Sequence, residues 1–296
     1  MVVSGHTHRS YICDYAKVDA KKPFLLTSAG LYGTLLTEIK LTVDAKTRRV
    51  SSRSARQNIV QGEAFTSGTT TVALQPSFPV YQPDAAVAEL LERYKAAAQP
   101  LSATTIGRLA GLASRVPQAN GESVMGRIIA DALLAATQDA AAGGAELAPA
   151  ADGSVTYGQL FSVQPFGNTL MVMSLTGEQI HQVLEQQFNS GTNTVDAPRI
   201  LQVSQGFTYR FDRSQPAGQR VSEMRLNGQL LDTARSYRVG LQSYLGTGGD
   251  NFSVFTQGTD LVGGSLDLDA LVDYVRVQSQ QQPMLLPLQE RIAQVY

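Results

Sequence analysis

The sequence is poor in several residue types, and each scarcity excludes a class of protein. Cys13 is the only cysteine among 296 residues, so no disulfide can form within the chain. No apolar run approaches the length of a membrane-spanning helix. A formal net charge of -1 gives no reason to expect a nucleic-acid polymer or an anionic membrane as partner. With 43% hydrophobic and 17% charged residues, the chain is expected to be globular and long enough for two domains.

The start of the chain also lacks a leader. Met1 opens directly into an apolar strand that runs into Gly5 and two histidines, with no signal peptide, capping helix or polar tail before it. We therefore expect the chain to begin in the middle of a domain, so that the missing signal peptide says nothing about localisation.

Short strands are expected in the first sixty residues, where apolar or β-branched runs alternate with turn residues. These strands are predicted at 2–4, 11–13, 24–27, 35–43 and 50–58. The stretch 62–83 is rich in Ser, Thr, Pro and Gln and is expected to be a surface connection. Asp84 is predicted to cap a helix that ends before Pro100 and serves either as an interdomain strut or as an ordinary packing helix.

The rest of the chain mixes helices with strands, which predicts an α+β (mixed α/β) fold. Helices are expected from Ser123 to about residue 140, from a capping box at Thr176, and from near Asp267. The pair Asn227-Gly228 between two strand-like runs predicts a hairpin.

A glycine-rich stretch, QSYLGTGGDNF at 242–252, follows a predicted strand. Tyr244 and Phe252 flank the glycines, and Thr247 and Asp250 add a hydroxyl and a carboxylate. Aromatic faces beside hydrogen-bond acceptors suit a flat, sugar-bearing ring. A structural turn with Phe252 in the core explains the same residues equally well.

Two other loops carry candidate binding residues. Pro165 and Gly167 bracket Phe166, so the ring is expected to be presented at a bend, with Asn168 beside it. Arg115 lies in the polar loop before the Ser123 helix, where it either meets an anion or is a surface arginine.

Two of the three histidines stand together at the end of a strand, in Gly5-His6-Thr7-His8. His6 and His8 are either metal ligands or surface residues, since two imidazoles one residue apart can reach one ion if the backbone bends. His181 lies in a predicted helix with no carboxylate or cysteine at ligand spacing and is expected to be a packing or solvated residue.

Five stretches, spread from residue 5 to residue 252, resemble successive landmarks of the bacterial 5'-nucleotidase family, and the resemblance covers essentially the whole chain. They are GHTHRSYIC, TSAGLYGTLLTEIKLTVD, NGESVMGRIIADALLAATQ, VTYGQLFSVQPFGNTL and YRVGLQSYLGTGGDNF. The family includes UDP-sugar hydrolases and bifunctional 2',3'-cyclic-nucleotide phosphodiesterase/3'-nucleotidases. The resemblance implies three parts: the last strands of a calcineurin-like metallophosphatase domain at 1–72, a linker with a helix at 73–101, and a C-terminal nucleoside-binding domain at 102–296.

The resemblance also implies chemistry in the N-terminal part. His6 and His8 match late ligands of a site that holds two divalent ions of Zn, Mn or Co type and activates a water for attack on a phosphate. The family's earlier metal motifs would all precede Met1, so the chain is expected to be an inactive fragment of a metal-dependent nucleotide phosphohydrolase. Export to the periplasm or cell surface is implied in the same way.

In the C-terminal part the resemblance implies a nucleoside clamp. Phe166 and Tyr244 would sandwich the base, Asn168 would contact it, Asp250 would accept from the ribose hydroxyls, and Arg115 would help to bind the substrate. Family members usually carry Phe where Tyr244 stands.

One departure from the family lies in this part, after Leu147, where a strand and a segment like Asn-Pro-Gly-Gly-Ile-Arg are missing.

Two alternatives to a fragment of a hydrolase stay open. The chain is either a nucleoside-binding module without hydrolysis, or an unstable fragment whose first strands lack the sheet they should pair with.

Overall fold

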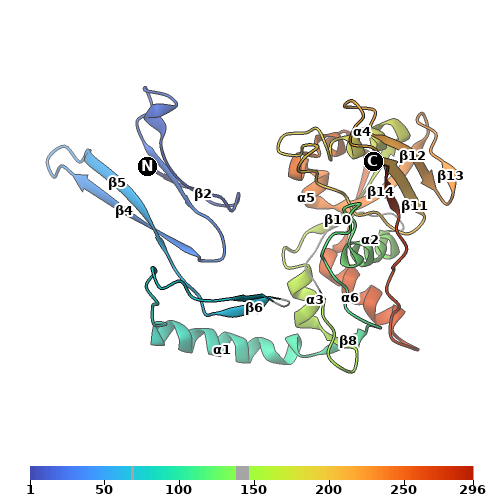
Figure 1. Ribbon diagram of the computed structural model, residues 1–296, viewed down its shortest axis with the longest axis horizontal. Coiled ribbons are helices and arrows are strands. Elements are labelled where there is room, and N and C mark those ends of the chain that lie inside the picture. The colour runs from blue at the N-terminus through green and yellow to red at the C-terminus, as the bar shows by residue number, and fades with distance from the viewer. Residues whose placement is uncertain (68–69, 138–146, 296) are drawn as a thin grey trace. The chain divides into compact units, whose positions relative to one another are not determined.

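A computed structural model describes residues 1–67, 70–137 and 147–295 of the chain (Figure 1). The chain divides into two compact units, Met1–Arg93 and Tyr94–Tyr296, here called the first and second units. The second unit mixes strands and helices along the chain, as the α+β prediction required. The boundary between the units falls inside helix α1 (Ala85–Ser102).

The first unit is built from short strands, as predicted. Strands β1 (Val2–Val3), β3 (Leu25–Ala29) and β2 (Ser10–Asp14) form one sheet in that order, with a 3-10 turn, η1 (Tyr15–Lys17), after β2. Strands β4 (Leu35–Val43) and β5 (Val50–Ile59) pair antiparallel. The stretch 62–83, expected to be a surface connection, contains one additional feature, since β6 (Phe65–Ser67) and β7 (Thr70–Val72) pair antiparallel there.

Helix α1 begins as predicted but ends later. The Val87 backbone N–H donates to Asp84 Oδ1 at 3.0 Å, so Asp84 caps the helix. The prediction that the helix ends before Pro100 is wrong, since Pro100 lies inside it. The missing proline N–H removes one hydrogen bond, and the helical pattern resumes when the Ala103 N–H donates to Gln99 O at 2.9 Å.

The second unit contains three sheets. The antiparallel sheet that matters most for the site has the order β14 (Ser236–Gln242), β10 (Thr169–Thr176), β15 (Thr259–Leu266). A four-stranded sheet has the order β13 (Gln229–Leu230), β12 (Val221–Leu226), β11 (Phe207–Phe211), β16 (Ile292–Gln294). Strands β8 (Thr105–Arg108) and β9 (Ser154–Thr156) form a two-stranded ladder.

The helices of the second unit begin where their caps predict. The Ser123 hydroxyl accepts from the Gly126 N–H at 3.0 Å at the start of α2 (Val124–Thr137). Thr176 opens α4 (Gly177–Glu185) through the predicted capping box. A second capping box, at Thr156, opens α3 (Tyr157–Val163), which the sequence reading missed. The last helix, α6 (Asp267–Gln278), starts at the expected residue.

Three further predictions concern the end of the Ser123 helix, the Asn227-Gly228 hairpin and the segment after Leu147. The predicted end of the Ser123 helix near residue 140 lies outside them. Asn227 and Gly228 adopt φ values of 51° and 81°, which confirms the predicted hairpin. Between Leu147, which bridges to Ala113, and β9 the described chain contains no further strand.

Two hydrophobic cores fill the second unit. One packs α2, α3 and α6 against β8 and β10, and α2 and α6 run side by side in Figure 1. The other packs α4 and the 3-10 turn η3 (Ser253–Gln257) between the two larger sheets. The largest side chains of the second core are Phe188, Tyr209, Phe211 and Phe252. Among the described helices, none combines the length and the apolarity needed to cross a membrane.

Candidate functional site

The register of the β10–β14 ladder brings two of the predicted loops to one end of the sheet. Leu170 lies opposite Gln242 in this antiparallel pair. The chain enters the ladder just before Leu170 and leaves it just after Gln242, so the bend 164–168 and the glycine-rich loop 243–252 emerge at the same end.

A buried polar cluster ties these two loops together at their base. Asp267, the first residue of α6, accepts through Oδ2 from Asn168 Nδ2 at 3.2 Å and from Gln242 Nε2 at 3.0 Å. Gln242 Nε2 also donates to Gln164 Oε1 at 3.0 Å. Burial raises the pKa of the Asp267 carboxyl, against the opposing effect of its hydrogen bonds with Asn168 and Leu268. The cluster therefore holds the bend, the end of β14 and the start of α6 in one arrangement.

The structure separates the three aromatic candidates by their exposure. Phe166 is 80% exposed, at a bend where Gly167 has φ 63°. Tyr244, in the short helix α5 (Ser243–Gly246), is 41% exposed. Phe252 is fully buried and packs 6.2 Å from the ring of Phe255, centroid to centroid. The idea that Phe252 flanks a pocket is therefore wrong, and it is a core residue.

The hydroxyl of Tyr244 is joined to the carboxylate of Asp250. It donates to Asp250 Oδ1 at 3.1 Å and accepts from the Asp250 backbone N–H at 3.3 Å. On the other side, Arg199 Nη1 donates to Asp250 Oδ2 at 2.9 Å. Burial and the nearby carboxylate raise the pKa of the Tyr244 hydroxyl, so it remains a donor at neutral pH.

The backbone of the Asp250 turn, within η2 (Gly249–Asn251), is held in an uncommon conformation. Asp250 and Asn251 both have left-handed φ values, 53° and 67°. Asn193 Nδ2 donates to Asp250 O at 2.8 Å, and the Ser190 hydroxyl donates to Asn251 O at 2.6 Å. Gly191, at φ 56°, lets the two loops approach, because a Cβ there would lie 2.3 Å from Asn251 Oδ1. The loop 190–193 thus supports the turn that presents Asp250.

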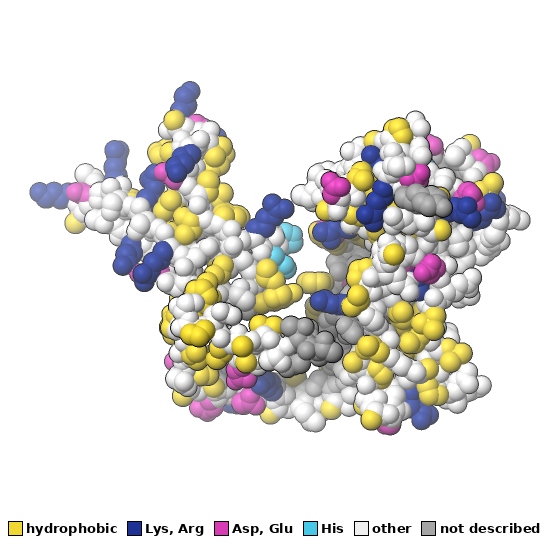
Figure 2. All heavy atoms as spheres, in the orientation of Figure 1, with side chains coloured by type: hydrophobic (Ala, Val, Ile, Leu, Met, Phe, Trp, Pro, Cys, Tyr) yellow, Lys and Arg dark blue, Asp and Glu magenta, His cyan; other side chains and the backbone are white. Residues whose placement is uncertain are grey.

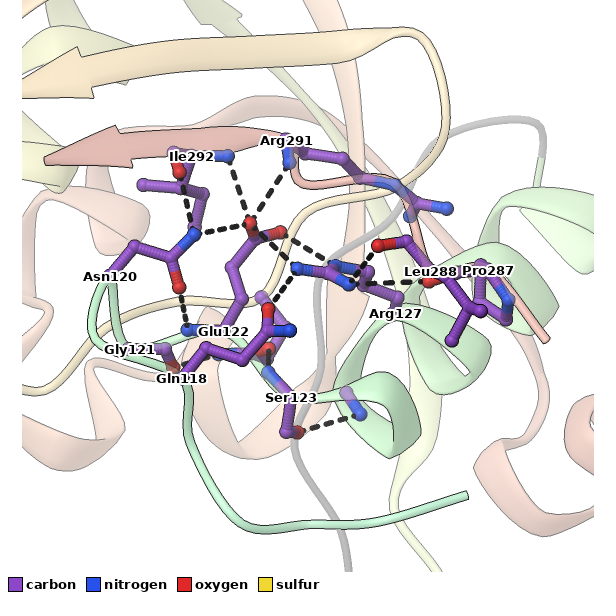
Figure 3. Close-up of polar contacts among 12 residues, drawn as sticks. Gln118, Asn120, Gly121, Glu122, Ser123, Arg127, Pro287, Leu288, Arg291 and Ile292 are labelled. Atoms are coloured by element: carbon purple, nitrogen blue, oxygen red, sulfur yellow. Dashed lines mark hydrogen bonds and ion pairs between the residues drawn. The ribbon is translucent and has the colours of Figure 1, made fainter. Parts of the chain in front are cut away.

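Arg115 is not brought to this cluster by any contact within the described chain. Its side chain is exposed, and it makes no hydrogen bond or ion pair with a described residue. Its loop is nevertheless well anchored, because Glu122 and Arg127 form a fully buried ion pair nearby (Figure 3).

His6 and His8 both adopt left-handed φ values, 66° and 57°, and are exposed. The ring of His8 lies 6.5 Å from that of Tyr32, centroid to centroid. Within the described ranges, no three His, Cys, Asp or Glu side chains lie close enough together to hold a metal ion. Two imidazoles alone do not complete a metal site, because a bound zinc-type ion takes at least three protein ligands.

His181 Nε2 lies 3.1 Å from Val221 O, so the ring packs against that strand, as expected. The expectation that no carboxylate stands at ligand spacing from His181 is wrong, because Glu185, four residues on, places Oε1 3.8 Å from the same nitrogen.

Charged side chains of both signs are interspersed on one face of the second unit. On the face drawn in Figure 2, Lys and Arg side chains of the second unit lie among Asp and Glu side chains and form no single basic patch.

Comparison with known proteins decides the family. The family described as "5'-nucleotidase, C-terminal domain" matches residues 103–257, just over half of the chain. The chain belongs to the 5'-nucleotidase family. The family resemblance read from the five sequence stretches is therefore confirmed.

Relatives within the 5'-nucleotidase family align over most of the chain. The trifunctional nucleotide phosphoesterase protein YfkN of Bacillus subtilis is 27% identical over 294 residues, which are 93% of this chain and 18% of that protein. The endonuclease YhcR of the same organism is 24% identical over 257 residues, 85% of this chain and 19% of that protein. The crystal structure of a 5'-nucleotidase precursor from Thermus thermophilus matches with a TM-score of 0.60 and 27% identity, over 94% of this chain and 53% of that one. The chain thus spans about half or less of the length of these relatives.

Sequence patterns did not identify three residues of the site. Gln242 and Asp267 are strand-end and helix-start residues whose side chains turn inward to meet Asn168. An acidic residue in the first turn of a helix is usually a solvated partner of the helix dipole, so nothing local marked Asp267. Arg199 lies 51 residues before Asp250, and no spacing rule links them.

Proposed function

We propose that the second unit binds a nucleoside, with Phe166 and Tyr244 stacking on the base and Asp250 accepting from the ribose hydroxyls. The observation that carries this proposal is that two exposed rings and a carboxylate emerge at the same end of the β10–β14 ladder. Two aromatic rings can stack on the two faces of a base, whatever the base. Family membership supports the assignment.

The polar residues fit supporting roles in this proposal. Asn168 Nδ2 is already held by Asp267, and its Oδ1 accepts no hydrogen bond within the described chain, so this oxygen is offered to an amino group of the base. Arg115 would approach the phosphate end of a nucleotide, for which its exposed guanidinium is suited.

We infer further that, in the intact protein, this domain presents a nucleotide phosphoester to a metal-dependent hydrolytic site. In this arrangement residues 1–72 belong to a metallophosphatase domain, 73–101 form the linker, and 102–296 form the nucleoside-binding domain. His6 and His8 would contribute two imidazoles to a site for divalent ions of Zn, Mn or Co type, and such ions supply an activated water. The ions need ligands beyond these two, so this chain alone is expected to hydrolyse no nucleotide.

A nucleoside-binding module without hydrolysis is the second candidate function. It is favoured by the fact that the hydrogen bonds from Asn168 to Asp267 and from Tyr244 to Asp250 both lie within the second unit. For either function we propose a location in the periplasm or at the cell surface. This proposal is supported by relatives named a cell wall protein of Listeria monocytogenes and a snake venom 5'-nucleotidase.

Calorimetric titration with adenosine and with AMP tests the clamp. Stacking of a base on an aromatic ring is worth roughly 1–3 kcal/mol, so Phe166→Ala and Tyr244→Ala should each weaken binding by about tenfold or more. Phe161→Ala is the matched control, because Phe161 is an exposed phenylalanine of α3, 49% exposed, outside the bend. The clamp is refuted if the folded wild type binds neither compound, or if all three variants bind equally well.

Release of inorganic phosphate from AMP and 3'-AMP, and of a nucleoside monophosphate from 2',3'-cyclic AMP, in the presence of Zn, Mn or Co separates the two candidate functions. The isolated chain should release none. Fusion to a phosphoesterase domain from a relative should restore metal-dependent release if the chain serves hydrolysis, and should leave binding alone if it is a binding module.

A further inference from the structure

A cavity of about 100 Å³ lies in the second core of the second unit, where α4 packs against β10, β12 and η3. Half-buried residues of three strands, Phe207 of β11, Leu226 of β12 and Val239 of β14, lie on the side where the cavity opens to solvent. The buried part of its wall is formed by Leu175, Val183, Leu184, Leu201, Val203 and Phe255. The wall is therefore almost entirely aliphatic and aromatic.

The cavity is separate from the proposed nucleoside clamp. Among the described residues that line it are none of the four clamp side chains, Phe166, Asn168, Tyr244 and Asp250. A molecule bound in the cavity would therefore contact a different set of residues from a nucleoside held by the two exposed rings.

One polar side chain of the cavity has no partner. Of the three lining residues with polar side chains, Tyr237 accepts through Oη from a backbone N–H at 2.9 Å. Arg238 Nη1 donates to Ser174 Oγ at 2.9 Å and to Asp260 O at 2.8 Å. Ser204 is only 7% exposed, and its hydroxyl makes no hydrogen bond with any residue that the structure describes. A buried hydroxyl without a partner lowers stability and points to a missing ligand.

Water is a poor occupant of this space. A buried water needs two to four polar partners, and apolar cavities stay dry. The lining of this cavity offers one polar side chain without a partner, at Ser204, and the rest of its buried wall is apolar. An apolar molecule that carries a single hydrogen-bonding group suits the lining better than a cluster of waters does.

We propose that this cavity binds a small neutral molecule with an aliphatic or aromatic body and one hydroxyl group. The body packs against the apolar wall, and the hydroxyl forms a hydrogen bond with Ser204. A cavity of about 150 Å³ lined by Leu, Ile and Phe takes up benzene. The present cavity is smaller but open on one side, so a molecule of one ring fits with its far edge at the opening. Nucleotides and phosphate do not suit it, because burying their charge in an apolar wall is costly.

The test uses phenol and toluene, which have nearly the same shape and differ by a hydroxyl against a methyl group. Each compound is titrated into the full chain, isotope-labelled at its Ile, Leu and Val methyl groups, and methyl spectra are recorded. Both compounds should shift the signals of cavity residues such as Val183, Leu184 and Leu201 in a saturable way. The signals of Ile128 and Ile129, in the other core, should stay in place.

Two variants separate the hydroxyl from the cavity itself. Ser204→Ala should weaken phenol binding by about threefold or more and leave toluene binding unchanged, because it removes one neutral hydrogen bond and no wall. Val239→Phe should abolish the binding of both compounds, because the larger side chain fills the space. Ser279→Ala is the matched control, since Ser279 is buried to a similar extent, at 8% exposure, but lies at the end of α6 away from the cavity.

The possible outcomes decide the proposal. The binding site is refuted if the cavity signals of the wild type do not saturate, if both cores shift equally, or if phenol stacks on the clamp rings and leaves the cavity signals in place. Binding that persists unchanged in Val239→Phe also overturns the site. Equal phenol affinities of the wild type and Ser204→Ala overturn the hydroxyl-bearing class of ligand. Ser204→Ala adds no volume, so the test holds even if Val239→Phe folds poorly.

Discussion

Replacing Glu122 by glutamine is expected to destabilise the second unit more than any surface substitution. The Glu122 carboxylate is fully buried and accepts five hydrogen bonds, two from the guanidinium of Arg127 and three from Asn120 Nδ2 and the backbone N–H groups of Arg291 and Ile292 (Figure 3). Arg127 is also fully buried and donates onward to Gln118 Oε1 at 2.6 Å and to the carbonyls of Pro287 and Leu288. The network joins the loop before α2 to the segment that leads into β16.

The size of the destabilisation follows from the buried groups that Glu122→Gln leaves without a suitable partner. Glutamine removes the negative charge from beside a buried guanidinium, and its NH2 group faces N–H donors where an acceptor stood. Removing one partner of a buried ion pair costs about 3–5 kcal/mol in the free energy of unfolding. With an m-value of about 2 kcal/mol per molar urea, the unfolding midpoint should fall by about 1.5–2.5 M.

Urea unfolding followed by near-ultraviolet circular dichroism provides the assay. The chain has no tryptophan, so the signal comes from tyrosines such as Tyr209, which is 1% exposed in the second unit. Glu178→Gln, at an exposed glutamate in the first turn of α4, is the matched control and should change the midpoint little. The double variant Glu122→Gln/Arg127→Met should cost less than the two single variants added together. A midpoint change below about 0.5 M for Glu122→Gln would show that the pair is not desolvated as described.

Two further predictions concern the site. Gly191→Ala should lower the free energy of unfolding by about 1–3 kcal/mol and weaken adenosine binding, because the new methyl group would meet Asn251 at a left-handed φ. Gly218→Ala, at φ 83° with open space around it, is the control that measures the cost of backbone strain without a clash, so equal effects in both variants would contradict the clash at Gly191. Because the pKa of Asp267 is raised, the folded state holds the carboxyl proton more tightly than the unfolded state. The free energy of unfolding of the wild type, relative to that of Asp267→Asn, should therefore fall as the pH rises from the ordinary carboxyl pKa of 3.8 to the raised pKa of Asp267, and should stay level at higher pH. Urea unfolding of both proteins between pH 3.5 and 7 checks the sign, and a rising difference over that interval would contradict it.

The sequence predicted well wherever a few neighbouring residues carry the physical cause. The Thr176 capping box, the Ser123 cap and the Asn227-Gly228 hairpin depend on side-chain and backbone hydrogen bonds within four residues, and all three are confirmed. Local reasoning failed at Pro100, where the hydrogen bonds on either side of the proline carry the helix through.

In the candidate site, too, features set by neighbouring residues were predictable and features set by tertiary packing were not. The bend around Phe166 was readable, because Pro165 and Gly167 restrict and release φ on either side of the ring. Whether Tyr244 or Phe252 faces solvent was not readable, since both flank the same glycines and only packing against Phe255 and its core buries one of them.

The sequence by itself determined the family, the caps, the turns and the presentation of Phe166, because these depend on residue types at short spacings. Only the tertiary structure decided that Leu170 stands opposite Gln242, that Asp267 ties the two loops together, and that Arg199 reaches Asp250. Most of these contacts join segments more than fifty residues apart, although Gln242 and Asp267 are 25 residues apart. The chain folds to make them through the register of a sheet and the burial of two cores, which no local pattern encodes.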